Sequence, residues 1–94
     1  MLMRRILIVG AGRSSAALVR YLLEKSFSEK LKVIIADISV DNAKKLVKDH
    51  ENAIVVELDI FNVESRQALV KGADIVISML PARFHMEIAK DCLA

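Results

Sequence analysis

The chain contains few of the residues that most strongly restrict a fold or a ligand. Its 94 residues include one cysteine, one proline and three glycines, and its aromatic residues are three phenylalanines and one tyrosine. A single cysteine excludes an internal disulfide and leaves the cytosol as the default compartment. So few aromatic side chains leave almost nothing on which nucleic-acid bases could stack.

Charge of one sign and long apolar runs are missing as well. The 14 basic and 12 acidic residues leave a net charge of +2 and are scattered along the chain, so no basic stripe indicates nucleic acid. No apolar run approaches the ~18–20 residues of a membrane helix, and the run Ile6–Val9 is too short for a secretory signal. We therefore expect a cytoplasmic protein whose partners include neither nucleic acid nor a membrane.

What the chain does contain is apolar sequence in a regular pattern. It is 54% hydrophobic with a mean hydropathy of +0.39, which argues against disorder. Short runs rich in Ile and Val predict strands buried on both faces, at Arg5–Val9, Lys32–Ala36, Ile54–Leu58 and Asp74–Ser78. Amphipathic runs between them predict helices, at Arg13–Lys25, Val40–His50, Val63–Lys71 and Ala82–Leu93. Ser39 and Asn62 are expected to cap two of these helices, and Gly72 to end the third helix in a left-handed conformation.

Strands that alternate with helices predict an α/β fold with a Rossmann-like, doubly wound parallel sheet. For four strands the expected order is 3-2-1-4. The fifth and sixth strands of such a fold and any substrate domain are absent, so the predicted sheet is truncated. We interpret residues 1–94 as the N-terminal dinucleotide-binding domain of a larger protein, a part that should not catalyse by itself. The unpaired edge of the fourth strand predicts self-association, and thus a homo-oligomer.

The first predicted strand runs straight into Gly10-Ala11-Gly12, which opens the first helix. Gly10 suits a sharp turn because it has no Cβ. Gly12 suits the close approach of a pyrophosphate to the backbone, with Arg13 and the hydroxyls of Ser14 and Ser15 as further candidate contacts. Ser15 takes the third small position on the core face of the helix, where its hydroxyl is expected to bond back to the helix backbone.

An acidic residue ends the second predicted strand. Asp37 follows the glycine turn at close to the ~20-residue spacing of a ribose-binding acid, and Ile38 beside it is a further candidate contact. A carboxylate there would oppose the 2′-phosphate of NADP by about 4 kcal/mol per unit charge at ~4 Å. Lys44 and Lys45 lie further along the next helix. The sequence therefore predicts NAD as the cofactor in preference to NADP.

The ends of the third and fourth predicted strands supply the remaining candidates. Asp59 could receive the adenine amino group or cap the following helix, and Ile60 lies next to it. Beside the nicotinamide half we expect Ser78, Leu80 and Pro81. His85 could serve as an acid–base group, or could simply bond to backbone or to a substrate carboxylate early in the last helix. No cluster of residues predicts a metal site.

Several of these motifs together resemble the N-terminal domain of the saccharopine dehydrogenase family. They are Gly10-Ala11-Gly12, the strand ending in Leu58-Asp59, and Ser78 with Pro81 and His85. The resemblance implies hydride transfer between a nicotinamide and a carbon that bears an amine nitrogen, on a small carboxylated amine held by a domain this chain lacks. Family members that release glutamate use NAD, whereas those that make saccharopine from the semialdehyde and glutamate often use NADP. Asp37 fits the NAD branch. Ser15 departs from the glycine or alanine that is common in the family.

Two other functions remain open at this point. Nucleotide-sensing regulatory domains of potassium channels share a glycine turn followed by arginine and an acidic end to the second strand. A catalytically inert scaffold or dimerisation domain would need no ligand at all. The stretch SMLPARFH favours the enzyme, because a sensor has no need of a proline loop that leads into a histidine-bearing helix.

Overall fold

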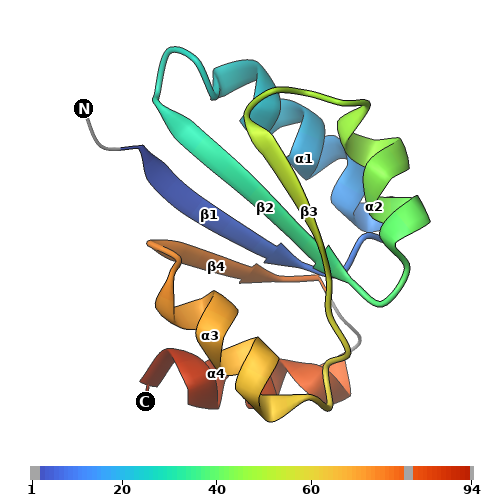
Figure 1. The fold of residues 1–94 in the computed structure, drawn as a ribbon, viewed down its shortest axis with the longest axis vertical. Coiled ribbons are helices and arrows are strands. Elements are labelled where there is room, and N and C mark those ends of the chain that lie inside the picture. The colour runs from blue at the N-terminus through green and yellow to red at the C-terminus, as the bar shows by residue number, and fades with distance from the viewer. Residues whose placement is uncertain (1–2, 80–81, 94) are drawn as a thin grey trace.

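A computed structural model describes residues 3–79 and 82–93, with the side chains of 13, 14 and 82–87 left undescribed (Figure 1). The strands are β1 (Arg4–Val9), β2 (Leu31–Asp37), β3 (Ala53–Glu57) and β4 (Ile75–Ser78). The helices are α1 (Arg13–Lys25), α2 (Val40–Val47), α3 (Val63–Lys71) and α4 (Ala82–Leu93). Each predicted strand is present, with bounds that differ from the prediction by a single residue.

The strands form one parallel sheet in the order β3-β2-β1-β4, which confirms the predicted topology (Figure 1). Val9 pairs with Ala36 of β2 on one side and with Ser78 of β4 on the other. Asp37 pairs with Glu57 of β3. The carboxyl ends of all four strands therefore meet at one edge of the sheet, where ligands bind in folds of this type.

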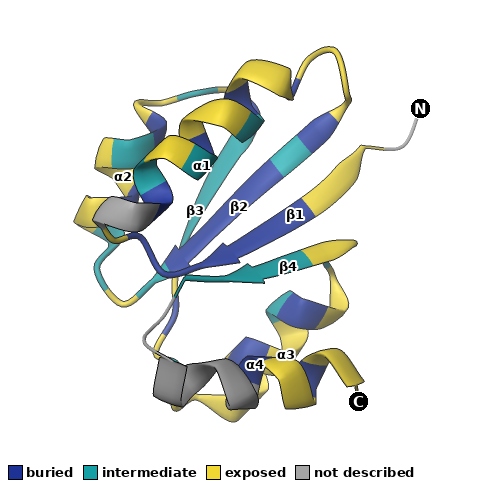
Figure 2. Cartoon of the chain, turned by 180° about the vertical axis from the view of Figure 1, so that it is seen from behind, coloured by how far each residue is buried: buried dark blue, intermediate teal, exposed yellow. Residues whose placement is uncertain are grey.

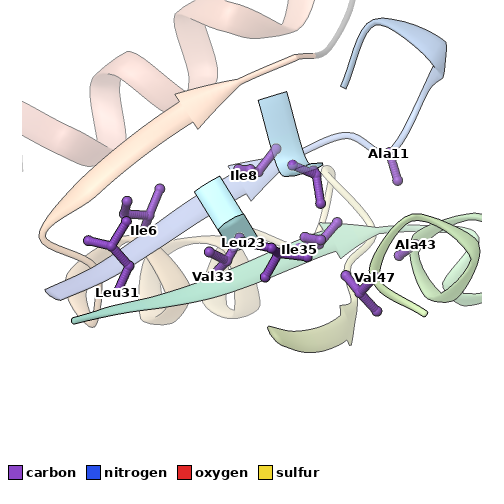
Figure 3. Close-up of a cluster of buried hydrophobic side chains, with 10 residues drawn as sticks. Ile6, Ile8, Ala11, Leu23, Leu31, Val33, Ile35, Ala43 and Val47 are labelled. Atoms are coloured by element: carbon purple, nitrogen blue, oxygen red, sulfur yellow. The ribbon is translucent and has the colours of Figure 1, made fainter. Parts of the chain in front are cut away.

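Side chains of β1 and β2 alternate between the two faces of the sheet and build two separate cores. Ile6, Ile8, Val33 and Ile35 pack with α1 and α2 (Figure 3). Leu7, Val9, Ile34 and Ala36 pack with Val70 of α3 and Ile88 of α4. Burial of each large side chain contributes ~1.5–3 kcal/mol, so the two inner strands stabilise both helix layers at once.

The outer strands are less buried than the inner ones (Figure 2). In β4 the side chain of Ile75 is 47% exposed, and among the described residues β4 has a strand neighbour on one side alone. The exposed edge is thus as predicted, while self-association through it stays a prediction. No helix in the described part of the chain is both long enough and apolar enough to cross a membrane.

Two helix ends differ from the prediction. The second helix ends at Val47 rather than His50, because Lys48 and Asp49 take left-handed φ values of 48° and 60°. Gly72 is right-handed, with φ −80° and ψ −3°, so the predicted left-handed end of α3 is wrong. There the last turn tightens instead, with the Ala73 N–H donating to the Val70 carbonyl (3.2 Å), and residues 72–74 connect α3 to β4.

Candidate functional site

The glycine turn begins with a residue that has to be glycine. Gly10 has φ 105°, a conformation that L side chains rarely adopt. Its N–H still donates to the carbonyl of Ala36 (2.8 Å), so the β1–β2 ladder continues up to the turn. Gly10 therefore lets the chain leave the sheet abruptly at the edge where the strand ends meet.

Gly12, by contrast, is glycine for no reason found within the described chain. Its φ of −83° and ψ of −175° are extended backbone that any residue adopts. A Cβ built at this position meets no heavy atom within 4 Å. The space in front of Gly12 is open, and this is the space that a phosphate needs to approach the backbone.

The N-terminus of α1 lacks a side-chain cap for its first N–H groups among the described residues. Gly12 is the N-cap and offers no side-chain acceptor, and the first turn carries no acidic residue. The first N–H groups of a helix have no intrahelical partners and, with the helix dipole, attract an anion. With these N–H groups and the open space at Gly12, the start of α1 is a suitable binding site for a diphosphate.

Ser15 has a structural role that differs from the predicted one. Its side chain is fully buried, and its hydroxyl donates to the carbonyl of Gly10 (2.8 Å) rather than to the helix backbone. Ser15 N–H is also engaged, to the carbonyl of Gly12 (3.0 Å). The serine therefore ties the first turn of α1 to the end of β1, and its hydroxyl is not available to a phosphate.

Asp37 is held against the glycine turn from the end of β2. Its Oδ2 accepts the N–H of Ala11 (2.6 Å), and its Oδ1 accepts the N–H of Ser39 (2.7 Å). The half-buried carboxylate thus joins the turn after β1 to the loop after β2. Each carboxylate oxygen has a second lone pair, so both can still accept a ribose hydroxyl.

Beside Asp37 a mainly apolar cavity of about 260 Å³ opens between the ends of β2 and β3. Its wall contains the predicted contacts Ile38, Asp59 and Ile60, which come from two different loops. Asp59 accepts the N–H of Phe61 at Oδ1 (2.9 Å), whereas Asn62 is the residue that caps α3. We call this cavity the adenine cleft, after the adenine that the sequence predicts beside Asp59.

Sequence reasoning does not identify Phe61, and it sets Lys45 aside as lying too far along the second helix. Phe61 lies in the cleft wall with its side chain 74% exposed, and an aromatic residue in the loop between the third strand and the following helix was the available signal. Lys45 lines an open groove of about 450 Å³ that it shares with Gly12. The two residues are far apart in the sequence, and only the packing of α2 brings Lys45 to the groove beside Gly12.

The end of β4 carries a polar atom that the described residues leave without a partner. The Oγ of Ser78 is buried and has no hydrogen bond there. Ser78 pairs with Val9, and the N–H of Met79 donates to the Val9 carbonyl (2.8 Å), so this end lies beside the glycine turn. Such an atom fits a site completed by a ligand. Leu80, Pro81 and the side chains of Arg13, Ser14 and His85 lie outside the described residues.

Known proteins resemble this chain over nearly its whole length. A family model described as "Saccharopine dehydrogenase NADP binding domain" matches residues 6–94. The chain is 33% identical over 79 residues to the shikimate dehydrogenase (NADP(+)) of Methanosphaera stadtmanae, covering 83% of this chain and 27% of that protein. It is 36% identical over 61 residues to the alpha-aminoadipic semialdehyde synthase of Arabidopsis thaliana, covering 65% of this chain and 6% of that protein.

The fold has a counterpart among solved structures. The apo saccharopine dehydrogenase (L-Glu forming) from Saccharomyces cerevisiae matches with a TM-score of 0.85 at 22% identity, covering 96% of this chain and 19% of that chain. At this identity the likeness shows the fold alone. In each comparison the chain spans only a part of the length of the protein that it matches.

Proposed function

The chain belongs to the family of saccharopine dehydrogenase NADP-binding domains, and from that premise we propose that it is the cofactor-binding part of an oxidoreductase that acts on a carboxylated secondary amine. Family membership confirms the resemblance found in the motifs. The observation that carries the proposal is the open backbone at Gly12, set beside a carboxylate that already touches the same turn. Both groups lie at the carboxyl edge of the parallel sheet, where dinucleotides bind.

Each part of a dinucleotide has a matching feature in this chain. The start of α1 would hold the diphosphate, since it has no side-chain cap hydrogen bond among the described residues. Asp37 would accept the hydroxyls of the adenosine ribose, and the cleft wall at Ile38 and Ile60 would enclose the adenine. The end of β4 at Ser78 would border the nicotinamide half. When bound, a nicotinamide supplies or accepts the hydride at the carbon that bears the nitrogen.

The choice between NAD and NADP sets two features of the protein against each other. In the proposed complex Asp37 would place a negative charge beside the ribose, which favours NAD. The family description and one relative are named for NADP, and Lys45 offers a cation in the groove next to Gly12. We propose NAD, because Asp37 contacts the turn directly whereas Lys45 is an exposed side chain on α2.

The chain spans 27% and 6% of the two curated relatives named above, and in the proposed enzyme the substrate would be held by residues beyond this cofactor-binding part. Family membership supports a small carboxylated amine, with saccharopine as the type. The channel-type nucleotide sensor gains no support from the family or from the relatives named above. A homo-oligomer built through the β4 edge remains part of the proposal.

Calorimetric titration of the chain with NADH, NADPH and ADP-ribose tests the proposal. We expect NADH to bind at least about tenfold more tightly than NADPH, which corresponds to ~1.4 kcal/mol. We also expect NADH to bind more tightly than ADP-ribose, because the nicotinamide half adds contacts at β4. Equal, weak binding of all three would favour a sensor, and no binding would favour a scaffold. Tighter binding of NADPH would overturn the preference for NAD and leave the family assignment intact.

A further inference from the structure

A buried ion pair lies on the α3–α4 side of the sheet, within an otherwise apolar layer. Arg66 of α3 and Asp91 of α4 are 5% and 8% exposed. The guanidinium engages the carboxylate through two nitrogens, with Nε donating to Oδ2 and Nη2 to Oδ1 (3.3 Å). A buried pair of this kind is no more stabilising than apolar residues of similar volume, so helix packing alone does not require it.

The same guanidinium has a third contact, and this one leads to the adenine cleft. Nη1 of Arg66 donates to the main-chain carbonyl of Ile60 (2.9 Å). Ile60 lies in the cleft wall between Asp59 and Phe61. Asp59 holds the N–H of Phe61 from one side (2.9 Å), and Arg66 holds the carbonyl of Ile60 from the other.

We propose that Arg66, oriented by Asp91, is a positioning residue that fixes the Ile60–Phe61 wall of the adenine cleft. The planar fork of arginine makes this possible, because it can engage a carboxylate through two nitrogens and still direct a third toward the wall. Asp91 sets the rotation of the fork, and thereby the direction of Nη1. The inference rests on the proposed function, since it assigns the wall its role in binding the adenine half.

The double variant Arg66→Leu/Asp91→Leu separates positioning from packing. Replacing both charges avoids a buried unpaired ion, so the chain is expected to remain folded with an unchanged or higher melting temperature. Losing one charged donor at Ile60 should weaken AMP binding about five- to tenfold. Binding of nicotinamide mononucleotide should not change, because the proposed nicotinamide site lies at the end of β4, away from the cleft beside β2 and β3. Lys71→Leu, an exposed substitution on the same helix, is the matched control and should leave both affinities unaltered.

Amide hydrogen exchange on the ligand-free chain is a second test, and it requires no nucleotide. In the double variant the amides of residues 60–62 should exchange about five- to tenfold faster, while the strands keep their protection. Arg66→Lys should give the same local increase, since an ammonium cannot hold both Asp91 and Ile60 in the geometry of the fork. Unchanged exchange at the wall would overturn the inference, and so would wild-type AMP affinity in the double variant. If the wild-type chain bound neither AMP nor NADH, the proposed function would fail, and exchange at the wall would still decide whether Arg66 positions it.

Discussion

The start of α1 and the starts of α2 and α3 are completed in different ways. Ser39 caps α2 by accepting the N–H of Asn42 (3.4 Å), and Asn62 caps α3 by accepting the N–H of Ser65 (3.1 Å). Both helices also carry an acidic residue in the first turn, whereas α1 has neither a side-chain cap nor an acid there. The two starts at α2 and α3 are thus closed by their own side chains, whereas the first N–H groups of α1 have no such acceptor among the described residues.

The largest effect should come from giving α1 the kind of start that α2 and α3 have. Gly12→Asp places a carboxylate at the N-cap, where it accepts first-turn N–H groups and stabilises the helix by about 0.5–1 kcal/mol. The same charge repels a diphosphate, so NADH affinity should fall by more than about a hundredfold. Thermal melting and calorimetry would therefore move in opposite directions.

Gly12→Ser is the matched control for that variant. It adds a cap without a charge, and the open space around a Cβ at this position predicts that the fold accepts it. Its loss of NADH affinity should be smaller than that of Gly12→Asp. If Gly12→Asp bound NADH as the wild type does, the open start of α1 would have no role in binding.

A smaller effect is expected at the side chain that joins the open start of α1 to the loop before α2. In Asp37→Asn one of the two backbone N–H groups would face an amide N–H, so a charged hydrogen bond is lost. Loss of that bond should lower the free energy of unfolding by about 1.5–3 kcal/mol. NADH affinity should fall about tenfold, while NADPH affinity should hold or rise because the repulsion at the ribose is gone. Titrations with both cofactors would check this, and an equal loss for the two would show that Asp37 only supports the turn.

The smallest effect should come from the two completed helix starts. Ser39→Ala and Asn62→Ala each remove one side-chain cap, and each should lower the free energy of unfolding by about 1 kcal/mol. Neither residue is placed in the ligand site, so NADH affinity should stay within about threefold of wild type. Denaturant unfolding with parallel titrations would measure both quantities. A large loss of binding in either variant would remove the distinction between the helix starts.

Features that depend on neighbouring residues in the sequence were predictable. The parallel α/β fold follows from the alternation of apolar and amphipathic runs, and the order 3-2-1-4 is the one that doubly wound folds of this class adopt. The caps Ser39 and Asn62 were predictable too, since a cap bonds within its own first turn. So was the need for glycine at position 10, where the strand turns away from the sheet.

Features that depend on which contacts form in the folded chain were not predictable. The buried hydroxyl of Ser15 bonds to Gly10 because the strand end, not the helix, is the acceptor within reach. Gly72 is right-handed, and its N–H remains bonded to the carbonyl of Ala68 as part of the last helical turn. The partnership of Arg66 with Asp91 and Ile60 joins three segments, and no spacing in the sequence relates them.

The sequence by itself determined the Rossmann-like sheet and the identity of the glycine turn, because periodicity and turn chemistry act over a few residues. Only the tertiary structure decided that Asp37 bonds to the turn, that Gly12 is open, and that Arg66 reaches the cleft wall. These three facts concern distances between segments far apart in the chain. Such distances are set by the packing of helices on a sheet, which no local pattern encodes.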